Sequence, residues 1–98
     1  QLLTLVQYTK LEGATDYVNS MWELQDEPFK GDVVNSYNDG PPSSGAKPLG
    51  PFYELESSSP ALALKPGESA THIHRTIHLK GDETVVRDLG QVILGAVD

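Results

Sequence analysis

The sequence predicts a small all-β protein that folds as an antiparallel β-sandwich. Short segments rich in β-branched and aromatic residues alternate apolar with polar side chains, which is typical of strands. Clusters of Gly, Pro, Asn and Ser separate these segments and predict turns, because these residues adopt the backbone conformations that turns require. The chain of 98 residues can bury one modest core, so we expect residues 1–98 to form a single domain.

Three strands are predicted in the first half of the chain. The first begins at Leu2, continues through Tyr8 in a partly alternating apolar run and is ended by Glu12-Gly13. Residues 17–24 suggest a second strand, and the proline-containing segment 25–28 would end it, because proline cannot donate a ladder hydrogen bond. Residues 32–37 form the third strand. Residues 38–51 are then expected to form one long surface loop, since turn-forming residues fill them almost throughout.

The next predicted strand, residues 52–56, carries two acidic side chains. Strand alternation places Phe52, Glu54 and Glu56 on one face and Tyr53 on the other. The two carboxyl groups therefore share a side of the sheet, about 6.5 to 7 Å apart at Cα. Because they line one wall, they do not face each other across a bond in the manner of a glycosidase pair.

A hairpin and a helix are predicted after that strand. Residues 61–64 form a short strand, residues 65–68 a turn, and residues 71–79 the returning strand. The returning strand carries three imidazoles on one face: His72, His74 and His78. Apolar residues at 3- and 4-residue spacing then favour a helix over residues 82–94. Gly90 weakens that prediction, and a strand over residues 92–94 is the alternative.

Composition and charge exclude several function classes. Fourteen acidic residues against seven basic ones give a net charge of -7, which argues against nucleic acid as a partner. The absence of cysteine excludes disulfides and a cysteine-ligated zinc site. No apolar run approaches the roughly 18 to 20 residues that span a bilayer, so we expect no membrane partner. A cytoplasmic and a periplasmic or secreted location are not distinguished.

The residues from 52 to 72 follow a recognisable order: a strand ending in Leu55-Glu56, a small polar bend with Pro60, an apolar run, Leu-Lys-Pro-Gly-Glu at residues 64–68, and His72. This order resembles the last strands of the galactose mutarotase (aldose 1-epimerase) superfamily. Residues 22–40 are similar to uncharacterised bacterial members of that superfamily. The resemblance covers the C-terminal part only. It implies part of a β super-sandwich, a hexose ligand in an open cleft, and no metal or other cofactor.

The resemblance also implies that Glu56 is the catalytic base of a sugar epimerase. Mutarotation needs both a base and an acid, and the family's acid is a histidine that precedes the glutamate. No histidine precedes Glu56 in this chain, and the family's sugar-gripping Arg and Asp belong to the part that the resemblance does not cover. We therefore expect a carbohydrate-binding domain or a non-catalytic remnant of an epimerase-like protein. A solvated carboxylate on a strand face is the other interpretation of Glu56.

Aromatic side chains supply further ligand-binding candidates, because flat rings suit the C–H faces of sugars. We expect Trp22 and Phe52 to fill the sandwich interior, and Tyr37 and Tyr53 to lie at its rim. The full set of candidate ligand-binding residues is Trp22, Tyr37, Tyr53, Glu54, His72 and His74.

The segment His72-Ile73-His74 permits an alternative function, that of a small cupin-like metal-binding enzyme. Two imidazoles at this spacing share a strand face, as in several β-barrel metal sites, and Pro66-Gly67 upstream is similar to the first cupin motif. However, His78 and Leu79 stand where that motif has an acid, and no second motif follows. The solvent-facing side of an antiparallel sheet explains the same pattern, so we assign no metal ligand.

Self-association is also expected. Part of a super-sandwich would leave a sheet face and at least one long edge uncovered, and natural sheets cover both. The prediction is a homodimer or a higher oligomer.

Overall fold

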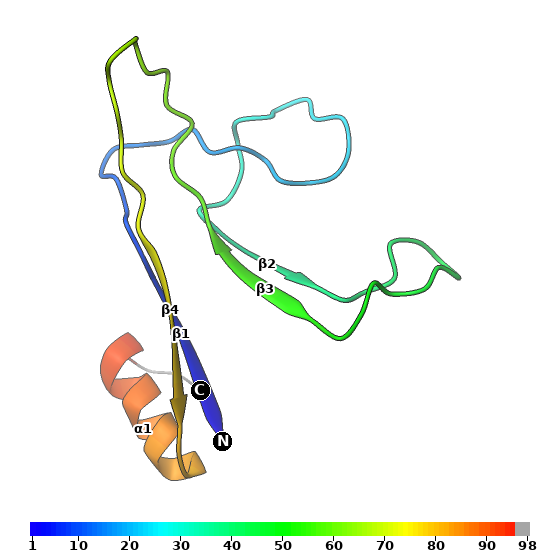
Figure 1. The fold of residues 1–98 in the computed structure, drawn as a ribbon, viewed down its shortest axis with the longest axis vertical. Helices are drawn as coiled ribbons and strands as arrows, with labels where there is room; N and C mark the ends of the chain where they lie inside the picture. Colours follow the sequence, from blue (N-terminus) through cyan, green and yellow to red (C-terminus); the bar gives the residue numbers. More distant parts are fainter. Residues whose placement is uncertain (96–98) are drawn as a thin grey trace. The chain divides into compact units, whose positions relative to one another are not determined.

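The computed structural model describes residues 1–95, which form two antiparallel sheets and one helix (Figure 1). The elements in chain order are β1 (Leu2–Tyr8), β2 (Val34–Asn38), β3 (Tyr53–Ser57), β4 (His74–Lys80) and α1 (Glu83–Leu94). β1 pairs with β4, and β2 pairs with β3. The all-β class, the antiparallel pairing and the C-terminal helix are therefore confirmed. Face-to-face packing of the two sheets as a sandwich stays a prediction.

The chain divides into two compact units. The first unit contains residues 1–8 and the chain from Ile73 onward, and the second contains residues 9–72. Each unit holds one of the two sheets.

In the first unit, β1 and β4 pair along their whole length, from Leu2 opposite Lys80 to Tyr8 opposite His74. Directly opposed residues share a face of an antiparallel sheet, so the two strands build one apolar side together. That side carries Leu3, Leu5, Ile77 and Leu79, and its far end carries a hydrogen bond of 3.1 Å from Arg75 to Gln7. The opposite side carries Thr4, Thr76, His74 and His78.

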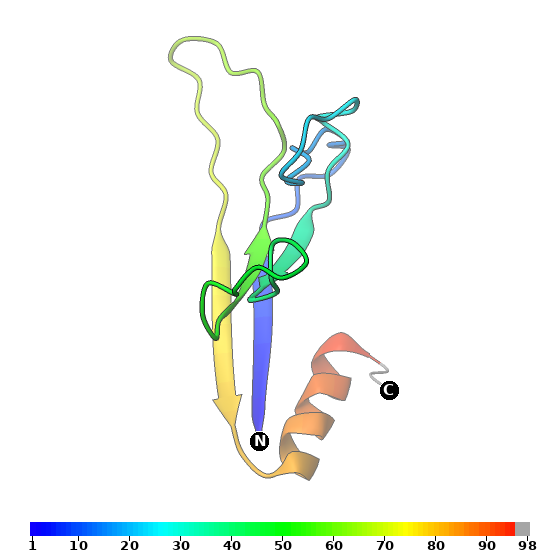
Figure 2. The ribbon, with the colours of Figure 1, turned by 90° about the vertical axis from the view of Figure 1, so that its right-hand side faces the viewer.

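Helix α1 turns back after β4 and lies beside this sheet (Figure 2). It contacts β1 through Gly90, where an added Cβ would lie 3.9 Å from the side chain of Leu3. Val86, one turn earlier, is only 8% exposed. The predicted helix is confirmed, and the alternative strand over residues 92–94 is wrong. Apolar spacing decided the outcome because it gives the helix a face to bury against β1.

In the second unit, β2 and β3 form a hairpin with Val34 opposite Ser57 and Asn38 opposite Tyr53. The two strands are joined by the long loop that the sequence predicts, which has no helix or strand of its own. Two bonds close the loop where it meets the strands: the Asp39 amide donates to the Phe52 carbonyl at 3.1 Å, and the Gly50 amide donates to Asp39 Oδ1 at 2.9 Å.

The strand predicted over residues 17–24 is wrong. Residues 17–31 form a closed loop instead, held by a single bridge between Tyr17 and Lys30 and by a bond of 2.8 Å from the Gly31 amide to the Tyr17 carbonyl. Inside the loop, the Asn19 side chain accepts a hydrogen bond from the Met21 amide at 3.1 Å. Such local side-chain bonds compete with a strand ladder, which explains the difference.

The predicted hairpin around residues 65–68 is only partly correct. Its turn is present, with the Glu68 amide donating to the Lys65 carbonyl at 3.0 Å and the Glu68 carboxylate accepting from the Lys65 amide at 2.9 Å. Residues 61–64 form no strand, and β3 and β4 pair with other strands rather than with each other. The last strand begins at His74 rather than at residue 71, so His72 lies outside it.

Few side chains are buried within the part of the chain that the structure describes. Tyr17 is 6% exposed, and it joins Val86 as one of two buried hydrophobic residues. Trp22 is 98% exposed and Phe52 is 38% exposed, so the prediction that they fill a sandwich interior is wrong. The physical reason is that sheets of two strands offer little area on which to bury a large ring. Within residues 1–95, no helix is both long and apolar enough to cross a membrane.

Candidate functional site

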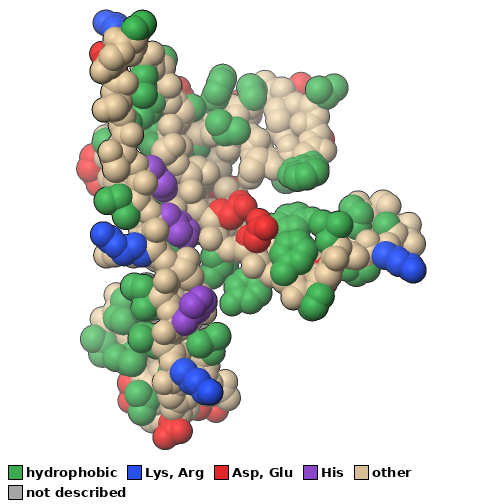
Figure 3. Space-filling view, viewed as in Figure 1, with side chains coloured by type: hydrophobic (Ala, Val, Ile, Leu, Met, Phe, Trp, Pro, Cys, Tyr) green, Lys and Arg blue, Asp and Glu red, His purple; other side chains and the backbone are tan. Residues whose placement is uncertain are grey.

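One face of the β2–β3 hairpin brings aromatic and acidic side chains together. Tyr37 lies directly opposite Glu54, and Asn35 lies directly opposite Glu56. Phe52 precedes β3 and continues the same alternation, so its ring follows Glu54 and Glu56 along one side. In the space-filling view, acidic side chains lie next to hydrophobic ones along this hairpin (Figure 3). We call Tyr37, Phe52, Glu54 and Glu56 the hairpin face.

The two rings of the hairpin face pack against each other. The ring centroids of Tyr37 and Phe52 are 5.9 Å apart, and the ring planes are inclined by 29°. Tyr37 is 41% exposed, and its place at the rim of a sandwich stays a prediction. Each ring supports the other, and the ring surface that remains exposed is available to a flat, apolar ligand surface.

The Glu54 carboxyl group is affected by the neighbouring Glu56 on the hairpin face. The pKa of Glu54 is raised above its ordinary value, first by a hydrogen bond with the Glu56 carboxyl, then by desolvation, and then by the charge of Glu56. A hydrogen bond between two carboxyl groups requires one of them to be protonated. The pair therefore favours a single negative charge over two. Neither β2 nor β3 contains a Lys or Arg that would compensate the second charge.

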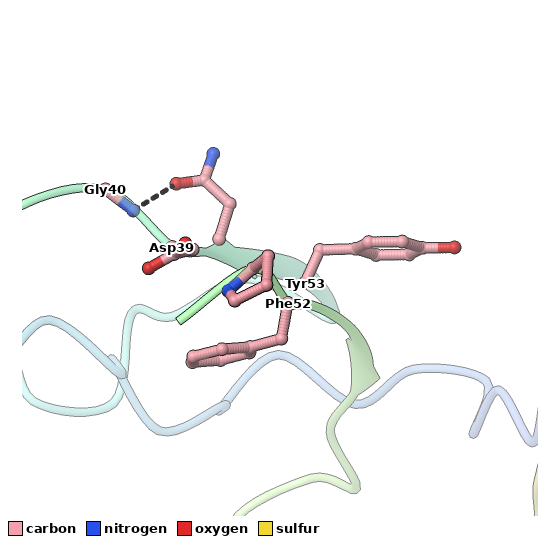
Figure 4. A pocket seen from close by; sticks show the side chains of 6 residues that line it. Asp39, Gly40, Phe52 and Tyr53 are labelled. Atoms are coloured by element: carbon pink, nitrogen blue, oxygen red, sulfur yellow. Dashed lines mark hydrogen bonds between the residues drawn. The ribbon is translucent and has the colours of Figure 1, made fainter. Parts of the chain in front are cut away.

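A shallow open pocket of about 420 Å³ lies where the hairpin meets the long loop (Figure 4). It is lined by Asn38, Asp39, Gly40, Pro51, Phe52 and Tyr53. The Asn38 side chain accepts a hydrogen bond from the Gly40 amide at 3.1 Å, which fixes the start of the loop. Phe52 belongs both to the hairpin face and to this pocket, whereas the pocket residues Asn38 and Tyr53 are directly opposed and lie on the other face of the hairpin.

The histidines occupy two separate environments rather than one strand face. His72 Nε2 lies 3.0 Å from Ser57 Oγ, at the end of β3. On β4, His78 Nδ1 lies 3.0 Å from Thr4 Oγ1, and His74 Nε2 lies 3.2 Å from Thr76 Oγ1. The prediction of three aligned imidazoles is therefore wrong, because β4 begins after His72. Within residues 1–95, no group of three or more His, Asp or Glu side chains is placed to hold a metal ion.

Glu56 has another carboxyl group as its neighbour on the hairpin face. Ser57 follows Glu56 in β3, and strand alternation directs their side chains to opposite faces. His72 is hydrogen-bonded to Ser57, so its imidazole is held at the opposite face. The structure thus places Glu54, Glu56 and Tyr37 on one face of the hairpin and Tyr53 on the other. Trp22 lies in the closed loop of residues 17–31, and His74 lies at the start of β4.

Sequence patterns did not find every part of this surface. Strand alternation was sufficient to place Glu54 and Glu56 side by side. The stack of Phe52 on Tyr37 was missed, because it depends on the pairing of two strands separated by a long loop. The turn-forming cluster Asn38-Asp39-Gly40 was the sequence signal for the pocket, because its side-chain hydrogen bonds to nearby amides shape the pocket wall.

A family model described as "Family of unknown function (DUF6786)" matches residues 1–97. No curated protein and no solved structure gives a significant match to the chain.

Proposed function

We propose that this chain, which belongs to the DUF6786 family, is a non-catalytic carbohydrate-binding domain of mutarotase-like ancestry. The observation that supports binding most strongly is the stack of Tyr37 on Phe52 beside the Glu54 and Glu56 carboxyl groups. A pyranose has an apolar face of C–H groups and a rim of hydroxyl groups. Half-exposed aromatic rings suit the apolar C–H face, and carboxylate oxygens accept hydrogen bonds from the hydroxyl groups.

The pocket where the hairpin meets the loop offers a second contact region, which includes Phe52. Its lining includes the amide side chain of Asn38 and the carboxylate of Asp39, which are common hydrogen-bonding partners for hydroxyl groups. Asp39 already accepts a bond from the Gly50 amide, and its remaining lone pairs are free to accept others. A monosaccharide unit would lie on Phe52 with its hydroxyl groups directed toward the loop.

We do not propose catalysis, because this surface lacks a complete acid–base pair. An epimerase needs one group to remove a proton and another to supply one. Glu56 is accompanied by Glu54, and the His72 ring is bonded to Ser57 on the other strand face. The mutarotase-like ancestry is supported by the order of residues from 52 to 72 alone.

The cupin-like alternative has less support than carbohydrate binding. It depends on two imidazoles on one strand face, and His72 lies outside β4 while His74 lies within it. Metal analysis of the purified protein tests it: stoichiometric zinc, iron or manganese would favour this alternative.

The experiment that tests the proposed function is an NMR titration of the ¹⁵N-labelled chain with glucose, galactose and their oligosaccharides. We expect amide shifts to change in β2, in β3 and at the pocket residues, with little change in α1. Phe52→Ala should abolish these changes, whereas Val92→Ala on the exposed side of α1 should retain them. Absence of saturable shift changes with every sugar would exclude the proposal.

A further inference from the structure

We propose that the outer edge of β1 pairs with β1 of a second copy of the chain in antiparallel orientation, so that two small sheets join into one of order β4-β1-β1-β4. The elements involved, β1, β4 and α1, all belong to the first unit. Three observations carry the proposal: the direction of the β1 backbone groups, the contrast in charge between β1 and β4, and a groove that borders β1.

The backbone groups of β1 point alternately toward β4 and away from it. Gln1 and Gly81 exchange two hydrogen bonds, from the Gln1 nitrogen to the Gly81 carbonyl at 2.8 Å and from the Gly81 amide to the Gln1 carbonyl at 3.1 Å. Bonded and non-bonded pairs alternate along antiparallel strands, so Leu3, Leu5 and Gln7 direct their backbone groups to β4. The other residues of β1 direct theirs to the outer edge: Leu2, Thr4, Val6 and Tyr8. Within residues 1–95, no strand pairs with that edge.

The two outer edges of this sheet differ in charge. β1 contains no charged residue, no proline and no glycine. β4 carries Arg75 and Lys80 together with two imidazoles. Natural proteins protect sheet edges with charged side chains, especially lysine, and with proline. The edge of β4 therefore disfavours pairing with a second β4, whereas the edge of β1 permits pairing.

β1 is complementary to itself in antiparallel orientation, which makes a second copy of the chain the partner. When Leu5 lies opposite Leu5 of the other copy, Thr4 lies opposite Val6, and Leu2 lies opposite Tyr8. Each residue that directs its backbone groups outward then meets another that does the same, so these groups bond one another. A two-fold axis through the Leu5 pair generates this register, as the self-complementary interface of a homodimer requires.

A groove of about 300 Å³ lies between the beginning of β1 and the first turns of α1. Its lining contains no residue of β4 and consists of Gln1, Leu2, Leu3, Glu83, Val86 and Arg87. Figure 2 shows α1 on the side of β1 that faces away from β4. The end of the added strand would enter this groove, because Tyr8 of the second copy lies opposite Leu2. Its ring would cover Leu2, which is otherwise 59% exposed.

Pairing also extends the apolar side of the sheet. Leu3 and Leu5 share this side with residues of β4, and α1 contacts it at Leu3. Two strands alone are marginally stable in water, whereas three or more strands with a hydrophobic face can be stable. The second copy would bring its own Leu3 and Leu5 to the side on which α1 lies. Apolar side chains that are still exposed there or on α1 are Ile77, Leu89 and Ile93.

A single-cysteine experiment tests the interface. The chain has no cysteine, so Leu5→Cys introduces a thiol at one known position. Residues opposite each other in a non-bonded antiparallel pair have Cα atoms about 4.5 Å apart, which is within disulfide range. We expect oxidised glutathione to give a disulfide-linked dimer on non-reducing electrophoresis. Ile77→Cys is the matched control: it lies on the same side of the sheet but in β4, and it should give no linked dimer.

Paired charge variants test the register without a cross-link. Thr4→Lys combined with Val6→Glu places opposite charges across the interface, whereas Thr4→Glu combined with Val6→Glu places like charges there. We expect the dissociation constant of the dimer, measured by sedimentation equilibrium, to be about tenfold higher for the like-charged variant. Both variants lose the contact between Thr4 and His78, so the comparison cancels that loss. Circular dichroism checks that both are folded.

Three results would each overturn the pairing of β1 with β1. A linked dimer from Ile77→Cys, with none from Leu5→Cys, would assign the interface to the β4 edge. Equal dissociation constants for the two charge variants would exclude the register that places Thr4 opposite Val6. An unmodified chain that is folded and monomeric at micromolar concentrations would exclude the homodimer itself.

Discussion

Phe52 stacks on Tyr37 across the β2–β3 hairpin, with ring centroids 5.9 Å apart and ring planes inclined by 29°. The contact joins a residue in β2 to a residue that follows the long loop, so it fixes the loop end and the hairpin together. The same rings form the apolar part of the proposed sugar site. Their contribution to stability can therefore be measured apart from their contribution to binding.

We expect a double-mutant cycle with Tyr37→Leu and Phe52→Leu to give a coupling free energy of about 0.5 to 1.5 kcal/mol, the usual range for an aromatic pair. Urea unfolding of the two single variants, the double variant and the unmodified chain supplies the four values. Additive losses would show that the two rings do not support each other.

The raised pKa of Glu54 predicts a pH-dependent loss of stability. A carboxyl group with a higher pKa in the folded chain than in the unfolded chain binds more protons when folded, so stability falls as pH rises between the two values. The folded pKa of Glu54 lies above its ordinary value of 4.5, which sets the lower limit of this window. Glu54→Gln should therefore gain stability relative to the unmodified chain as pH rises from about 4 toward neutrality.

Thermal unfolding midpoints of both proteins, measured through that pH range, check this prediction. The difference between variant and parent is the informative quantity, because the other carboxyl groups titrate in both. Glu83→Gln serves as the control, since Glu83 is paired with Arg87 at 2.8 Å on exposed α1. A difference that does not change with pH would contradict the raised pKa of Glu54.

Local residue patterns predicted most elements but few of their partners. Alternation was sufficient for β1, β2 and β3, and apolar spacing was sufficient for α1, because each signal is contained within its own segment. Pairing of β1 with β4 joins the two ends of the chain, and no local signal encodes it. The turn at residues 65–68 suggested a hairpin, but residues 61–64 consist of Ala and Leu, which favour strands less than β-branched residues do.

In the candidate site too, features with a local sequence signal were predicted and features that depend on distant segments were not. The shared face of Glu54 and Glu56 was predictable because the period of a strand is two residues. The exposure of Trp22 was not, because a large ring next to apolar neighbours is more often buried, and only the closed loop of residues 17–31 presents it to solvent. His72 was misplaced because the start of β4 depends on where β1 ends.

Gly90→Ala should stabilise the first unit. Glycine in the middle of a helix costs about 0.5 to 1 kcal/mol relative to alanine. The added methyl group would lie 3.9 Å from the Leu3 side chain, which is an ordinary van der Waals contact. We therefore expect a gain of about 0.5 to 1 kcal/mol in the free energy of unfolding, measured by urea denaturation. Gly95→Ala is the matched control and should destabilise the protein, because Gly95 has a φ of 81°.

Gly31→Ala should open the closed loop of residues 17–31. An added Cβ would lie 2.0 Å from the Val18 carbonyl oxygen, so the backbone must move. That movement would break the bond from the Gly31 amide to the Tyr17 carbonyl and expose the Tyr17 ring. We expect a loss of about 1 to 3 kcal/mol, as for other overpacked positions. Amide exchange at Tyr17 and Asn19 should accelerate, whereas Ser20→Ala should leave it unchanged.

Self-association remains the prediction that follows from the exposed apolar side chains. Trp22 is the single tryptophan of the chain and is 98% exposed, so its fluorescence reports on burial of the closed loop. We expect light scattering at micromolar concentrations to give a dimer or a higher oligomer, because two-stranded sheets leave strand edges open to pairing. If the closed loop takes part, the Trp22 emission should shift to the blue as concentration rises. A folded chain that stays monomeric throughout that range would contradict the prediction, whatever the Trp22 emission shows.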